Sequence, residues 1–130
     1  MTGIIRTKKT FGRSERLILK SRIDQLFNKG ISKRAGCLRI IYFFTGEILE
    51  APVQVMFSVP KRQIHNAVDR NTIRRYMREA YRLHKNELGE QLGSDKKYVL
   101  LAFLFAGNQV ENYQSIQKDV RQLLGKIDVS

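Results

Sequence analysis

Residues 53–82 read VQVMFSVPKRQIHNAVDRNTIRRYMREAYR, and this stretch decides the fold of the chain. Apolar residues alternate over Val53–Val59, which is typical of a half-buried strand, and Pro60 ends the strand because proline cannot donate to a ladder. A helix is predicted from Ala67 to roughly Leu88. The nearly all-apolar Tyr98–Phe105 then predicts a strand buried on both faces. A strand, a helix and a second strand in this order predict a parallel strand pair within a mixed sheet.

The flanking segments complete the predicted architecture. Ser14–Phe27 has apolar residues at near-helical spacing, and Leu38–Phe44 is rich in β-branched and aromatic residues. Asn112–Leu124 has the apolar stripe of a last helix. The predicted fold class is therefore α+β, an α-β-β-α-β-α sandwich whose mixed sheet contains one β-α-β crossover. We expect one domain over residues 1–130, with residues 1–13 as a flexible N-terminal arm.

The composition restricts the classes of protein that fit. The chain has 130 residues, 42% of them hydrophobic, which favours one folded domain over a disordered basic tail. No apolar run approaches the ~20 residues of a membrane helix, and the N-terminus lacks the apolar block of a secretion signal. The single cysteine, Cys37, cannot form an internal disulfide. These features predict a cytoplasmic protein with no membrane partner.

The charge is concentrated in two blocks. The net charge is +12, with a balance of +9 over residues 1–39, −2 over 40–60, +5 over 61–84 and zero over 85–130. An uneven positive field favours a polyanion partner, because each phosphate that is neutralised releases counterions. Nucleic acid is favoured over an acidic membrane, although a generally basic protein with no such partner stays an alternative.

The central helix is predicted to be amphipathic, with a polar side of one sign. On a helical wheel its apolar face carries Ile73, Tyr76, Met77, Ala80 and Tyr81. The opposite face carries Arg70, Asn71, Arg74, Arg75, Arg78 and Arg82. Arginines at successive i,i+4 steps repel one another, and only Asp69 and Glu79 offset them. The pattern therefore favours RNA or DNA binding over an ordinary solvated face, since arginine binds phosphate bidentately and stacks on bases.

These residues resemble a known signature. Lys61-Arg62, Ala67-Val68, and then the run from Arg70-Asn71 through Arg74-Arg75 to Arg78-Glu79 are similar to the arginine-rich motif of the protein subunit of bacterial ribonuclease P. Outside the motif, Arg16-Leu17, Phe27, Gly30 and Tyr42 stand where that family has comparable residues. The resemblance covers roughly residues 14–105.

The resemblance implies a fold and a function. The fold is that of the second domain of ribosomal protein S5, with a left-handed β-α-β crossover where sequence alone favours the right-handed one. The implied function is to assist a catalytic RNA subunit, one protein per RNA, in removing the 5′ leader from precursor tRNA. The basic helix, with Lys61 and Arg62, would lie against the catalytic RNA.

The resemblance also implies a cleft between the first helix and the sheet that holds the single-stranded leader. Carried over by position, its lining residues are Arg16, Ile23, Phe27 and Tyr42. Many relatives have an aromatic residue where this chain has Ile23, so one stacking surface is missing here. Without the resemblance, Phe27 fits a helix core and Tyr42 fits strand packing.

The remaining basic residues leave two interpretations open. The N-terminal block is either a second phosphate-tracking surface or solubilising charge; it consists of Arg13, Arg16, Lys20, Arg22, Lys29, Lys33 and Arg34.

No catalytic or metal-binding motif is visible in the sequence. His65 and His84 are far apart and outside any zinc-type spacing, and neither a nucleophile–base pair nor a paired-carboxylate motif is present. We therefore expect magnesium to be held mainly by the RNA partner. Two alternatives remain, a ribosomal or ribosome-assembly protein of similar fold, and an independent endoribonuclease.

Overall fold

The computed structural model describes residues 11–128 apart from 87, 89–91 and 93–96. In chain order its elements are a 3-10 turn η1 (Arg13–Glu15), α1 (Lys20–Lys29), β1 (Ile31–Ala35), β2 (Leu38–Thr45), β3 (Val53–Ser58), α2 (Ala67–His84), β4 (Tyr98–Phe105) and α4 (Tyr113–Gly125). No helix in these described ranges is long and apolar enough to cross a membrane.

The described strands form one mixed sheet in the order β1-β2-β4-β3. β3 and β4 are parallel, whereas β1 pairs with β2 and β2 with β4 in antiparallel fashion. The predicted α+β class and the parallel pair joined through α2 are confirmed. The left-handed sense of this crossover stays a prediction.

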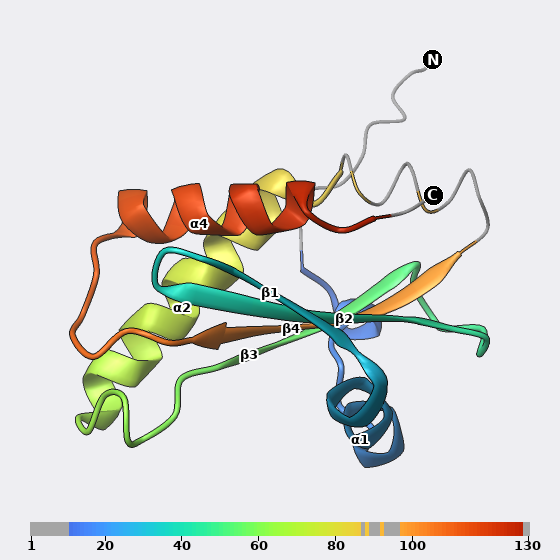
Figure 1. Cartoon of the computed structure of the whole chain (residues 1–130), viewed down its shortest axis with the longest axis horizontal. Helices are drawn as coiled ribbons and strands as arrows, with labels where there is room; N and C mark the ends of the chain where they lie inside the picture. The colour runs from blue at the N-terminus through green and yellow to red at the C-terminus, as the bar shows by residue number, and fades with distance from the viewer. Residues whose placement is uncertain (1–10, 87, 89–91, 93–96, 129–130) are drawn as a thin grey trace.

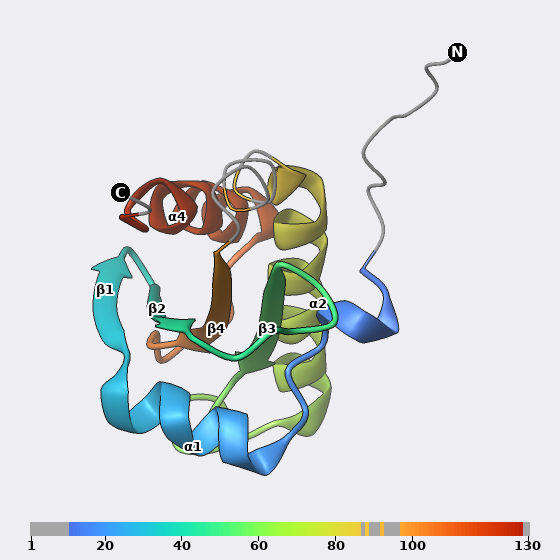
Figure 2. The same ribbon diagram turned by 90° about the vertical axis from the view of Figure 1, so that its right-hand side faces the viewer.

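The helices cover the two faces of the sheet unequally. α2 and α4 pack on one face and α1 lies on the other, as two views at right angles show (Figures 1 and 2). The larger core lies under α2 and α4, where Ile73, Met77 and Val120 meet the sheet with no exposed surface. A smaller core forms where Leu17 and Leu26 meet Leu100 on the α1 face. The sheet is thus covered on both sides; in the described part of the chain, the second side is covered by α1, the segment before it and Leu49 of the β2–β3 loop.

Local sequence explains where α2 begins. The Asn66 side chain accepts a hydrogen bond from the Val68 amide at 2.8 Å, which satisfies one of the amides that a helix start leaves unpaired. The apolar face predicted from the wheel is confirmed, since Ile73, Met77, Ala80 and Tyr81 are buried and Tyr76 is partly buried. The helix ends at His84 instead of near Leu88.

The first helix begins later than predicted. α1 starts at Lys20, not Ser14, because the preceding segment is extended along the edge of the sheet. Arg16 forms a parallel bridge with Val55, and the Leu17 amide donates to the Val55 carbonyl at 3.0 Å. The apolar run Leu17–Leu19 looks helical in sequence, but the backbone of Leu17 is hydrogen-bonded to β3.

Near the N-terminus, one prediction needs correction and one strand lacks a sequence signal. The prediction of a flexible arm over residues 1–13 is wrong for its last residues. The Phe11 ring packs edge-on against Phe57 and Tyr81, with ring centroids 5.7 and 6.1 Å apart. Residues 1–10 lie outside the described residues. Strand β1 was not predicted from the sequence, because only its last residue, Ala35, is buried.

Candidate nucleic-acid interface

The polar face of α2 points to solvent, as the wheel predicts. Asn71, Arg75 and Arg78 are exposed, and Arg70, Arg74 and Arg82 are partly buried. The Arg75 guanidinium lies 5.7 Å from the Tyr76 ring centroid, which holds it at the helix surface. No ion pair to a carboxylate occurs for Arg75 or Arg78 among the described residues. These two arginines therefore present uncompensated charge.

Arg70 and Arg74 have local partners. The Arg70 guanidinium donates to the carbonyls of Ile64 and His65 at 3.0 and 2.7 Å, and so ties the loop before α2 to the helix. Arg74 donates to the Asn71 side-chain oxygen. Neither contact neutralises charge, so both arginines stay positive while their orientation is restricted.

Arg82 differs from the other arginines of this face. It forms an ion pair with Glu79, with a 3.1 Å hydrogen bond from its Nε. This hydrogen bond lowers the pKa of the Glu79 carboxyl. The charge at this end of the face is therefore partly compensated, which the wheel alone did not show.

Lys61 and Arg62 are exposed in the turn that follows β3. The turn is fixed at both sides, because the Gln63 amide donates to the Pro60 carbonyl at 3.0 Å and its side chain donates to the Gly107 carbonyl at 2.7 Å. Both cations are thus held on a fixed turn in the segment that leads into α2.

The α1 face carries the second candidate surface. Ile23 is partly buried against the smaller core, and Phe27 is 44% exposed. Arg16 is exposed but does not lie on this face, because it pairs with Val55 of the α2-side core and its guanidinium lies 5.6 Å from the ring centroid of Phe11, which packs on that core; its assignment to a cleft beside α1 is therefore wrong. Ile41 and Phe43 of β2 are half-buried on the same face as α1 and are additional candidates for this surface. Their signal was present in the strand, where both alternate sets of residues are apolar.

Tyr42 does not lie on the α1 face, so its assignment to a cleft beside α1 is wrong. It is 2% exposed and belongs to the core under α2 and α4, where it sits beside Leu101 of β4. Successive side chains of a strand point to opposite faces, which places Ile41 and Phe43, not Tyr42, toward α1. The alternative prediction, that Tyr42 packs in the core as a strand residue, is confirmed.

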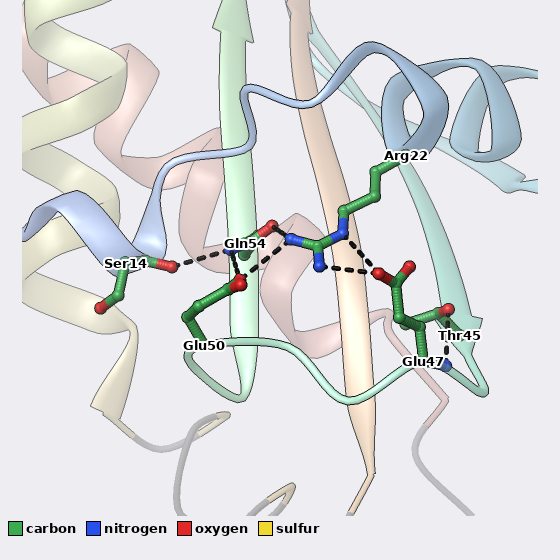
Figure 3. Close-up of polar contacts among 6 residues, drawn as sticks. All are labelled: Ser14, Arg22, Thr45, Glu47, Glu50 and Gln54. Atoms are coloured by element: carbon green, nitrogen blue, oxygen red, sulfur yellow. Dashed lines mark hydrogen bonds and ion pairs between the residues drawn. The ribbon is translucent and has the colours of Figure 1, made fainter.

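Arg22 is a buried structural residue rather than a surface cation. Its guanidinium lies between the β2–β3 loop and β3, donating to Glu47 at 2.7 and 3.1 Å, to Glu50 at 3.0 Å and to Gln54 at 3.0 Å (Figure 3). Gln54 in turn donates to the Ser14 carbonyl at 3.0 Å. The hydrogen bond from Arg22 lowers the pKa of Glu50. This network connects α1 to the loop and to the segment before α1.

Within the described residues, no group of three or more His, Cys, Asp or Glu side chains is placed to hold a metal ion. The described part of the site consists of basic, amide and aromatic side chains, which suit binding of a polyanion better than covalent chemistry.

An α+β domain with a one-signed arginine face on a central helix defines a nucleic-acid-binding class of protein. The sequence pattern of the Ribonuclease P family matches residues 11–128. The chain belongs to this family of ribonuclease P proteins. It is a protein component of a ribonucleoprotein endoribonuclease of tRNA processing, and its partner is an RNA subunit.

Individual relatives agree with this assignment. The chain is 32% identical to the ribonuclease P protein component of Porphyromonas gingivalis over 120 residues, covering 91% of this chain and 88% of the relative. It is 37% identical to that of Chlorobaculum tepidum over 114 residues, covering 81% and 74%. The solved RNase P protein of Staphylococcus aureus has the same fold, with a TM-score of 0.70, 20% identity, and coverage of 87% of this chain and 94% of that one. The alternative of a ribosomal protein is not favoured.

Proposed function

We propose that the chain binds the catalytic RNA through the solvent face of α2 and contacts the 5′ leader of precursor tRNA on the α1 face of the sheet. The observation that carries the first part is the charge of α2, where Arg75 and Arg78 are exposed without a carboxylate partner among the described residues. Phosphates of an RNA would supply the missing countercharge. Lys61 and Arg62 extend this basic surface along the chain.

The experiment for the α2 face is a comparison of salt dependence. We expect Arg78→Ala to weaken binding to the catalytic RNA by roughly 1–3 kcal/mol and to flatten the dependence of log K on log salt. Arg121→Ala is the matched control, because Arg121 is also exposed on a helix but lies on α4. Equal salt slopes for the Arg78 variant and the parent would contradict the proposal. Arg70→Ala is less suitable, since it also releases the loop before α2.

The support for leader binding is the pair of aromatic rings on the α1 face. Phe27 offers an exposed ring and Phe43 a half-buried one, whereas Arg16 pairs with Val55 and lies toward the α2 side of the sheet. Unpaired bases stack on such rings without sequence preference, which suits a protein that serves many tRNA precursors. Ile23 supplies an apolar wall but no stacking face.

Phe27→Ala tests leader contact without opening the core. We expect it to reduce the affinity of the holoenzyme for precursor tRNA by about 1–3 kcal/mol, and to leave the affinity for mature tRNA unchanged. Ile48→Ala is the control, because Ile48 is an exposed apolar residue of the β2–β3 loop. An equal loss for leader-bearing and leaderless tRNA would reject leader contact at Phe27.

Further parts of the proposal concern the assembly. We infer that one protein binds per RNA, that cleavage chemistry belongs to the RNA, and that magnesium is held mainly by RNA phosphate oxygens. A cytoplasmic location follows from this role in tRNA maturation. The competing hypothesis is an independent endoribonuclease, which predicts cleavage of precursor tRNA by the purified protein. We expect no cleavage until the catalytic RNA is added, and RNA-free cleavage that a point substitution abolishes would overturn the assignment.

A further inference from the structure

A pair of arginines on the sheet lies away from the helix face described above. The register of β1 and β2 sets Arg34 directly opposite Arg39. Directly opposed residues have their Cβ atoms about 4.5–5.5 Å apart, and like charges in this arrangement are destabilising. Both side chains are exposed. An arrangement that costs stability in the free protein therefore needs an explanation.

The two arginines are on the α1 face of the sheet. Their strand neighbours Ala35 and Leu38 are buried in the core under α2 and α4, so Arg34 and Arg39 point the other way. Among the described residues neither guanidinium has a carboxylate partner, and Arg34 donates only to the Gly36 carbonyl, at 3.3 Å. The pair therefore carries two uncompensated charges.

Protection of the sheet edge against pairing with other chains explains only one of these two arginines. Charged side chains on edge strands prevent pairing with other chains, and Arg34 belongs to β1 at the edge. Arg39 belongs to β2, which has β1 on one side and β4 on the other. A cation on the open face of an interior strand has no such protective role.

The register extends this pair into a row across the sheet. Arg39 lies opposite Leu104 of β4, and Leu104 lies opposite Ser58, the last residue of β3. Lys61 and Arg62 follow three and four residues later along the chain. Within the described structure, α1 packs farther along the strands, around Ile41 and Phe43, and leaves this row uncovered. Basic groups thus stand at both ends of an open row.

We infer that Arg34 and Arg39 bind phosphates of a single RNA backbone segment that crosses the sheet face beyond α1. Each guanidinium offers the planar fork that holds a phosphate bidentately, and the phosphates would remove the repulsion between the pair. This inference rests on the proposed function, because it assumes an RNA on the same protein. The phosphates belong either to the leader or to the catalytic RNA, and one set of measurements distinguishes these sources.

The test uses the reconstituted holoenzyme and the variants Arg39→Gln and Arg34→Gln. We measure the affinity for precursor tRNA with a leader, for leaderless tRNA, and of the protein for the catalytic RNA, each as a function of salt. Losing one charge-assisted contact is expected to cost roughly tenfold in affinity and to reduce the salt slope by about 0.7–0.9. Loss confined to leader-bearing tRNA assigns the phosphates to the leader, and loss in protein–RNA binding assigns them to the catalytic RNA.

Lys33→Gln is the matched control, since it removes one charge from β1 on the opposite face, beside Ile40. We expect it to bind as the parent does, and Arg39→Lys to recover part of the affinity by keeping the charge. Affinities and salt slopes for Arg39→Gln that equal those of Lys33→Gln would overturn the inference. If Arg78→Ala still weakens RNA binding in the same assays, the proposed function stands while this inference fails.

Discussion

Replacement of Arg22 by methionine isolates the contribution of the buried network that fastens α1. Methionine keeps an apolar stem of similar length but removes the guanidinium, whose side chain is 7% exposed. Glu47 and Glu50, at 48% and 60% side-chain exposure, can be rehydrated after the change. Gln54 cannot, because it is buried, and its side-chain oxygen loses the 3.0 Å bond from Arg22.

The expected cost follows from this asymmetry. A buried polar atom left without a partner costs about 1–3 kcal/mol, and the ion pair to the half-exposed Glu47 adds roughly 0–1 kcal/mol. Arg22→Met should therefore lower the free energy of unfolding by about 1–4 kcal/mol. By contrast, Glu47→Gln should cost less than about 1 kcal/mol, since it changes only an exposed partner.

Urea denaturation of the parent and both variants measures this difference. Equal stability of Arg22→Met and Glu47→Gln would refute the reasoning, because it would mean that Gln54 finds another partner. The effect should also depend on pH. The pKa of Glu50 is lowered by its hydrogen bond from Arg22, so its contribution is present above the ordinary glutamate pKa and is lost as the pH falls through the lowered value. The gap between parent and Arg22→Met should thus narrow in acid.

Three further predictions concern single positions. Gly36→Ala should destabilise the fold by about 1–3 kcal/mol, because Gly36 has φ +57° and a Cβ there would overlap the Asp119 carboxylate; an unchanged Tm would contradict this. Burial and then the hydrogen bond to Asp119 raise the pKa of Cys37 to about 12, so iodoacetamide should react with it far more slowly at pH 8 than with glutathione; similar rates would exclude the raised value. Tyr42→Ala should cost about 3–5 kcal/mol in stability and weaken binding of leader-bearing and leaderless tRNA alike, whereas a leader-specific loss would restore the cleft assignment.

The parts of the fold that follow from local pattern were predictable from the sequence. The apolar stripe of α2 and the alternation of Val53–Val59 are properties of neighbouring residues, and the structure confirms both elements. β1 was not predictable in this way, since Ile31–Ala35 buries only Ala35 and so shows no alternating pattern. This segment forms a strand because it pairs with β2, a contact that its own sequence pattern does not show.

The candidate site shows the same division. The arginine face of α2 follows from helical spacing, but the face of β2 that meets α1 does not, because both faces of that strand are apolar. Because side chains alternate along a strand, placing Tyr42 instead of Phe43 toward α1 assigns every side chain of β2 to the wrong face of the sheet. The sequence pattern places Arg22 among surface cations, because its partners Glu47 and Glu50 are 25 and 28 residues away. Only the folded chain brings them together.

The position of β4 has a consequence for the order of folding. This strand lies between β2 and β3 in the sheet, yet it follows both in the chain. During synthesis, the inner edges of β2 and β3 must remain unpaired until residues 98–105 emerge, and until then the sheet is limited to the β1–β2 hairpin and the short bridge of Arg16 to Val55. Chaperone binding and aggregation should therefore be greatest for nascent chains that end just before Tyr98.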